Sequence, residues 1–122
     1  MSATAMILFA HGARDPRWAA PFLRLQAMTQ DSLPGVAVRL AFLELMTPSL
    51  PELVEQLLAQ AHTHITLVPV FLGQGGHVLR DLPVMVDQLK TAHPELALTV
   101  VNAAGEQASV LAAIRDYCIA SI

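Results

Sequence analysis

Residues 67–81, LVPVFLGQGGHVLRD, contain the change from an apolar segment to a polar loop that decides the fold. The first six residues are mostly apolar and include two β-branched valines, which predicts a strand. Glycines at 73, 75 and 76 then predict a turn, and a helix is expected to begin near Asp81. His77 would lie at the carboxyl edge of the sheet, where open α/β folds bind ligands. We therefore take His77 as the first candidate functional residue.

The same arrangement occurs at the start of the chain. Residues 5–10, AMILFA, form a short apolar run that stops at His11 and Gly12. A further apolar run over residues 36–43 ends in Glu44. If the three strands are parallel neighbours, His11, Glu44 and His77 converge on one edge of the sheet.

Strands and helices alternate along the whole chain. Apolar runs predict strands, and periodic apolar positions or capping signals predict helices. The expected strands are 5–10, 36–43, 65–71 and 96–101, and the expected helices start at 16, 50, 81 and 106. Asp15 and Ser49 are the expected caps of the first two helices, and Pro69 marks the end of regular pairing. The pattern predicts an α/β fold, a four-stranded parallel sheet with helices on both faces, in one domain over residues 1–122.

Composition limits the class of protein. Hydrophobic residues make up 54% of the chain and charged residues 14%, so some apolar surface is expected to meet a second copy in a homodimer. A net charge of −3 argues against nucleic acid as a partner. No signal peptide and no apolar run of ~20 residues is visible, so we expect no membrane span and a cytoplasmic location. Cys118 is the only cysteine, and it is expected to be buried in the last helix with Leu111 and Ile114.

The candidate residues allow two kinds of chemistry. Two imidazoles and a carboxylate suit a borderline divalent ion such as Co²⁺, Ni²⁺, Fe²⁺ or Zn²⁺, and they equally suit proton transfer near neutral pH. A histidine at a strand end also fits a structural role, and Glu44 is also the first solvated position after its strand. The remaining histidines, at 62, 64 and 93, are expected at the surface or at helix ends.

Three arginines accompany the two histidine turns. Arg14, Arg17 and Arg80 favour a small anionic ligand, although solvated charges at helix starts are the alternative. The glycines do not indicate a nucleotide site, because Val78 takes the third glycine position of G-x-G-x-x-G and no GK[ST] sequence follows.

Three segments together resemble a known family. AHGARDP, AFLELMTPSLPE and VPVFLGQGGHVLRDLP, in this order, are similar to the motifs of short class II chelatases of the CbiX type, with their chelatase-like, flavodoxin-like βα repeat. The resemblance implies ATP-independent insertion of Co²⁺, or of Ni²⁺ or Fe²⁺, into sirohydrochlorin in cobalamin or related tetrapyrrole biosynthesis. The metal is then a substrate, and no prosthetic group is expected.

The resemblance also assigns roles to residues of this chain. The family's metal-handling histidines fall on His11 and His77, and its acidic position falls on Glu44. A half-size chain would pair with itself to build the cleft. Relatives often have G-x-H-P near the last helix, where this chain has Gln107, so a histidine role there is absent.

The resulting hypothesis is that His11 and His77 deliver the ion and accept protons, with assistance from Glu44. The three arginines would bind the acetate and propionate groups of the macrocycle. The residues expected beneath the ring are Leu72, Gly75, Gly76 and Val78. Two alternatives remain open: a carrier of tetrapyrrole or metal, and phosphoryl transfer on His11, for which Ala10 stands in place of the phosphate-binding arginine.

Overall fold

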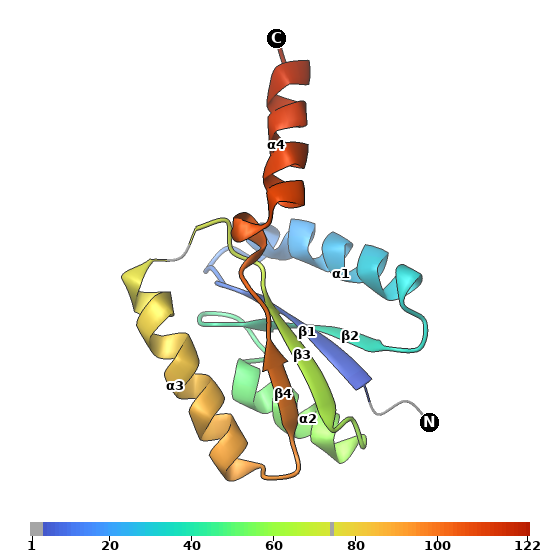
Figure 1. Cartoon of the computed structure of the whole chain (residues 1–122), viewed down its shortest axis with the longest axis vertical. Helices are drawn as coiled ribbons and strands as arrows, with labels where there is room; N and C mark the ends of the chain where they lie inside the picture. The colour runs from blue at the N-terminus through green and yellow to red at the C-terminus, as the bar shows by residue number, and fades with distance from the viewer. Residues whose placement is uncertain (1–3, 74) are drawn as a thin grey trace.

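The computed structural model describes residues 4–73 and 75–122, and of residues 76, 77 and 79 it describes the backbone but not the side chains. Its centre is a four-stranded sheet in which every pairing is parallel, with the order β2-β1-β3-β4 (Figure 1). The strands are β1 Thr4–Ala10, β2 Ala37–Phe42, β3 His64–Pro69 and β4 Ala97–Val100. The predicted parallel α/β architecture is confirmed.

Helices follow each strand, as the sequence predicts. The α-helices are α1 Ala20–Ser32, α2 Leu50–Ala59, α3 Gly76–Ala92 and α4 Ala108–Ala120. Two short 3-10 helices, η1 Pro16–Ala19 and η2 Ala104–Glu106, precede α1 and α4. No helix in the described part of the chain is long and apolar enough to span a bilayer.

The two faces of the sheet are covered unequally. On one face, Ile7, Phe9 and Leu67 of the sheet pack with the apolar sides of α2 and α3. On the other face, α1 packs over Leu8 and Leu40 of the two strands β1 and β2. On this side β3 contributes only the partly buried Val68, and among the described residues none of β4 belongs to the cluster.

Local signals explain most helix starts. Asp15 accepts a hydrogen bond from the Arg17 backbone N–H and caps η1, so the predicted first helix begins as a 3-10 turn before α1. At α2, the Ser49 hydroxyl accepts from the Glu52 N–H while the Glu52 carboxylate accepts from the Ser49 N–H. This reciprocal capping box is the predicted one. Pro69 ends β3, as expected.

Two helix predictions are wrong. Helix α3 begins at Gly76, not near Asp81, because Gly75 has the extended backbone of an N-cap residue and glycine is well accepted there. Leu111, Ile114 and Cys118 do not point into a core: α4 has no buried residue, and Cys118 is exposed. Figure 1 shows α4 extending away from the sheet, with the C-terminus at its far end.

Candidate active site

His11 and Glu44 meet at the carboxyl edge of the sheet. His11 follows β1 and Glu44 follows β2, and the two strands are neighbours in parallel register. His11 Nε2 lies 3.2 Å from Glu44 Oε2. Their side chains are 47% and 48% exposed, so the pair is open to a ligand from solution. The structure thus brings together two of the three edge residues predicted from the sequence.

Gly12 permits this contact. Backbone hydrogen bonds extend the sheet pairing beyond the strands, from Leu43 N–H to the Ala10 carbonyl and from Glu44 N–H to the His11 carbonyl. Gly12 has a φ of +98°, and a Cβ atom there would lie 1.9 Å from the backbone oxygen of Glu44. Only glycine fits this close approach. Sequence reasoning missed this role, although a glycine directly after the histidine was the available signal.

His77 follows the other neighbour of β1, strand β3, and lies in helix α3. Strand β3 pairs with β1 on the side opposite β2, and α3 starts at Gly76, so the His77 backbone lies in the first turn of that helix. The His77 side chain lies outside the described part of the structure. The topology places the His77 backbone after β3, whose carboxyl end lies on the same edge of the sheet as those of β1 and β2.

The predicted arginines have different surroundings. Arg17 forms a bidentate ion pair with Asp15, with Nη2 and Oδ2 2.6 Å apart, and this hydrogen bonding lowers the pKa of the Asp15 carboxyl. Arg14 lines a hollow of about 430 Å³ between the loops that follow β1 and β2, together with Leu45. Arg80 is exposed on α3. The charge of Arg17 is therefore already paired within the chain.

The buried ring of Phe71 packs against His11, and Phe71 was not among the predicted site residues. Its ring is 7% exposed and meets the His11 ring edge-on at a centroid distance of 6.3 Å. It also meets Phe9 edge-on at 5.9 Å, which ties the imidazole to the core. Because Phe71 and His11 lie far apart in the sequence, no local pattern indicated this contact.

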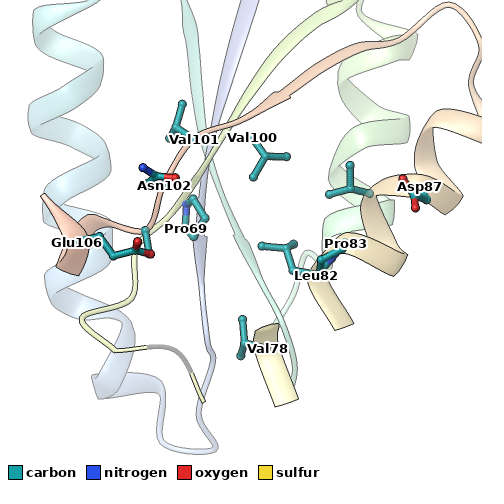
Figure 2. A pocket seen from close by; sticks show the side chains of 11 residues that line it. Pro69, Val78, Leu82, Pro83, Asp87, Val100, Val101, Asn102 and Glu106 are labelled. Carbon is teal, nitrogen blue, oxygen red and sulfur yellow. The ribbon is translucent and has the colours of Figure 1, made fainter. Parts of the chain in front are cut away.

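The residues predicted to contact the macrocycle differ in their burial. Val78 is 4% exposed and lines an apolar hollow of about 420 Å³ between α3 and the end of β4 (Figure 2). Pro69 and Leu82 line it as well. Leu72, by contrast, is 66% exposed, and Gly75 is exposed at the N-cap of α3.

The described side chains include two possible metal donors but no complete metal site. Among them, no group of three or more His, Cys, Asp or Glu residues is placed to hold a metal ion. His11 and Glu44 provide one nitrogen and one carboxylate donor, both suited to borderline divalent ions. An open pair of this kind binds an ion less firmly than a closed four-ligand site does.

The chain is similar to proteins of one family. The CbiX family model matches residues 5–119. The sirohydrochlorin cobaltochelatase of Methanocaldococcus jannaschii is 28% identical over 89 residues, which cover 73% of this chain and 62% of that protein. This chain therefore matches less than two thirds of the length of that relative.

Two solved structures share the fold. A cobalamin (vitamin B12) biosynthesis CbiX protein from Marinobacter aquaeolei is 32% identical, with a TM-score of 0.85 over 96% of this chain and 95% of the other. The sirohydrochlorin chelatase SirB from Bacillus subtilis, crystallised with cobalt, is 21% identical, with a TM-score of 0.83. That match covers 99% of this chain but only 51% of SirB, so this chain corresponds to about half of SirB.

Proposed function

Because the chain belongs to the CbiX family, we propose that it inserts a divalent metal ion into sirohydrochlorin without ATP, with Co²⁺ as the first candidate and Ni²⁺ or Fe²⁺ as alternatives. The observation that carries the proposal is the contact between His11 and Glu44 at an open sheet edge. The similarity to the sirohydrochlorin cobaltochelatase of Methanocaldococcus jannaschii favours Co²⁺.

The reaction needs acceptors for two protons. As one divalent ion enters the macrocycle, two pyrrole N–H protons leave and the ion gives up its water ligands. The His11 imidazole takes a proton, and the Glu44 carboxylate 3.2 Å away stabilises the imidazolium that forms. In this proposal His77 is the second acceptor and also holds the incoming ion.

Charge and shape hold the substrate. Sirohydrochlorin carries acetate and propionate groups, and charge-assisted hydrogen bonds from Arg14 and Arg80 would hold them. Arg17 can bind the substrate only if its ion pair with Asp15 breaks. We therefore propose that it contributes least to substrate binding. In the proposal the apolar ring lies against Leu72, Gly75, Gly76 and Val78.

The first test follows the absorption change when the purified protein is mixed anaerobically with sirohydrochlorin and Co²⁺. A histidine acting in proton transfer contributes about 10²–10⁴-fold to a rate. We expect His11→Ala and His77→Ala each to slow insertion by at least ~10²-fold, and Glu44→Gln to slow it less. His64→Ala is the matched control, because His64 is an exposed histidine at the opposite end of the sheet.

The outcomes separate the alternatives. Full activity of His77→Ala would disprove its assigned role. Product that stops at one equivalent per chain would show a carrier in place of an enzyme. Initial rates with Co²⁺, Ni²⁺ and Fe²⁺ compared side by side test the metal preference, and a faster rate with Ni²⁺ or Fe²⁺ would overturn the assignment of cobalt.

We further propose that the protein acts as a homodimer. This chain corresponds to about half of SirB, so a second copy would take the place of the remaining half. The high hydrophobic share of 54% also favours a partner surface.

A further inference from the structure

The segments that follow β3 and β4 meet again beyond the point where the two strands stop pairing. The last bond of their regular ladder runs from the Val101 N–H to the Leu67 carbonyl over 3.1 Å. Pro69 then has no N–H to donate, which interrupts the pairing. Further along both segments, the Gly105 N–H donates to the Phe71 carbonyl over 2.8 Å. The difference in residue number is 34 in both bonds (101 − 67 and 105 − 71), so the parallel register is kept across the interruption.

Space, and not backbone conformation, requires a glycine at position 105. Among the described glycines only Gly12 has a positive φ, so the backbone at Gly105 is one that a residue with a side chain can adopt. A Cβ atom at Gly105, however, would lie 1.8 Å from the carbonyl oxygen of Leu72 and 2.7 Å from its Cα atom. The obstacle is backbone, which cannot rotate away as the end of a long side chain can. Glycine therefore allows η2 to lie directly against the loop that follows β3.

Strand β1 holds the same loop from the other side. The Val70 N–H donates to the Phe9 carbonyl over 2.8 Å. The Phe71 ring meets both Phe9 and His11 edge-on. The start of the loop is therefore bonded to β1 on one side and to η2 on the other, and a displacement of Phe71 would change the surroundings of the His11 ring.

The same loop leads to the second candidate histidine. Gly75 is the N-cap of α3, and the His77 backbone lies in the first turn of that helix, only five residues after Leu72. Val78, the next residue of the helix, is 4% exposed within the core. Because the connection is so short, the position of Leu72 limits where the first turn of α3 can lie.

From these contacts we infer that Gly105 is a positioning residue for the candidate site: by holding η2 against the loop after β3, it fixes the His11 ring and the first turn of α3 relative to each other. The inference rests on the proposed chelatase reaction, in which His11 and His77 act on the same macrocycle. It gives Gly105 no contact with the substrate and no part in proton transfer.

Gly105→Ala tests the inference in the anaerobic assay with sirohydrochlorin and Co²⁺. To relieve the contact with the new methyl group, the Leu72 carbonyl oxygen must move by about 1 Å. A misplacement of this size can slow an enzyme by about 10²-fold. We expect kcat to fall by about that factor, whereas KM for sirohydrochlorin should stay within about threefold of the wild-type value, because the groups that bind the substrate are unchanged.

A spectroscopic measurement reports the placement of the histidines without turnover. In NMR spectra of the substrate-free protein, Gly105→Ala should shift the imidazole signals of His11 and the amide signals of residues 75–78. The imidazole signals of His64, at the opposite end of β3, should stay in place.

Gly73→Ala is the matched control, because it adds the same methyl group to the loop after β3. No atom lies within 4 Å of a Cβ there, so kcat and the His11 signals should remain those of the wild type. A fall in kcat equal to that of Gly105→Ala would overturn the specific role of position 105.

Hydrogen exchange tests the contact in the wild-type chain, and it applies even if Gly105→Ala does not fold. The Gly105 amide should exchange about as slowly as the Val101 amide of the ladder, since both donate to carbonyls of the β3 segment. Rapid exchange of the Gly105 amide would show that η2 is not held against the loop.

The kinetic outcomes separate this inference from the proposed function. A kcat of Gly105→Ala within about twofold of the wild type would remove the positioning role and leave the chelatase reaction standing. A raised KM with an unchanged kcat would show that position 105 acts on substrate binding and not on the histidines. If the wild type itself does not insert Co²⁺, the proposed function fails, and unchanged His11 signals in Gly105→Ala would separately overturn the placement of the ring.

Discussion

Replacing Gly12 with alanine tests whether backbone contact holds the candidate site together. At a φ of +98°, a residue with a side chain is strained, which costs about 1–2 kcal/mol. The new Cβ atom would also lie 1.9 Å from the Glu44 carbonyl oxygen, so the backbone there must move by about 1 Å. Overpacking that forces a backbone shift costs a further 1–3 kcal/mol or so. We expect the free energy of unfolding to fall by about 3 kcal/mol in total.

The assay is denaturant and thermal unfolding at one fixed protein concentration, because the proposed dimerisation would make stability depend on concentration. A loss of about 3 kcal/mol corresponds to a Tm lower by roughly 10 °C in a domain of this size. The matched control is Gly35→Ala, since no atom lies within 4 Å of a Cβ there, and its stability should stay within about 0.5 kcal/mol of wild type. If Gly12→Ala is equally neutral, the close approach of Glu44 does not constrain the site.

Three further predictions concern the capping box and the ring under the site. Ser49→Ala removes the hydroxyl that accepts from the Glu52 N–H and should lower the free energy of unfolding by about 1 kcal/mol in denaturant titrations, so an unchanged midpoint would argue against the cap. Hydrogen bonding from Ser49 lowers the pKa of Glu52, so the ionised carboxylate stabilises the fold above the unfolded pKa of about 4.3, and this contribution is lost as pH falls through the lower folded value. Wild type should therefore lose more stability than Glu52→Gln between about pH 6 and pH 3, and parallel pH profiles would contradict this. Phe71→Ala removes a buried ring against Phe9 and His11 and should cost about 3–5 kcal/mol by thermal unfolding, whereas a loss below about 1 kcal/mol would mean that the ring is not part of the core.

The sequence predicted the sheet well because its strands are short apolar runs covered on at least one face. The start of α3 was mispredicted because Gly75 and Gly76 were interpreted as loop residues, while an extended glycine is also an acceptable N-cap. The burial of Leu111 and Ile114 was mispredicted for a different reason. Periodicity identifies a side of a helix that needs a partner, but it does not say whether the partner surface belongs to the same chain.

The candidate site was predicted in part. His11 and Glu44 were expected to converge because each directly follows an apolar strand, and the structure brings their side chains to 3.2 Å. The strand order that makes β1 and β2 neighbours is a property of the whole sheet and of its crossovers, so no local pattern encodes it. The contact between Gly12 and Glu44 is likewise long-range. The role predicted for the His77 side chain stays a prediction.

The central position of β1 has a consequence for how the protein is made. Strand β1 ends at Ala10, but its second neighbour, β3, ends only at Pro69. During synthesis the first strand must therefore remain unpaired on one edge until more than half of the chain has emerged from the ribosome. Exposed strand edges promote aggregation, so nascent chains stalled before β3 should depend on chaperones more than the finished protein does.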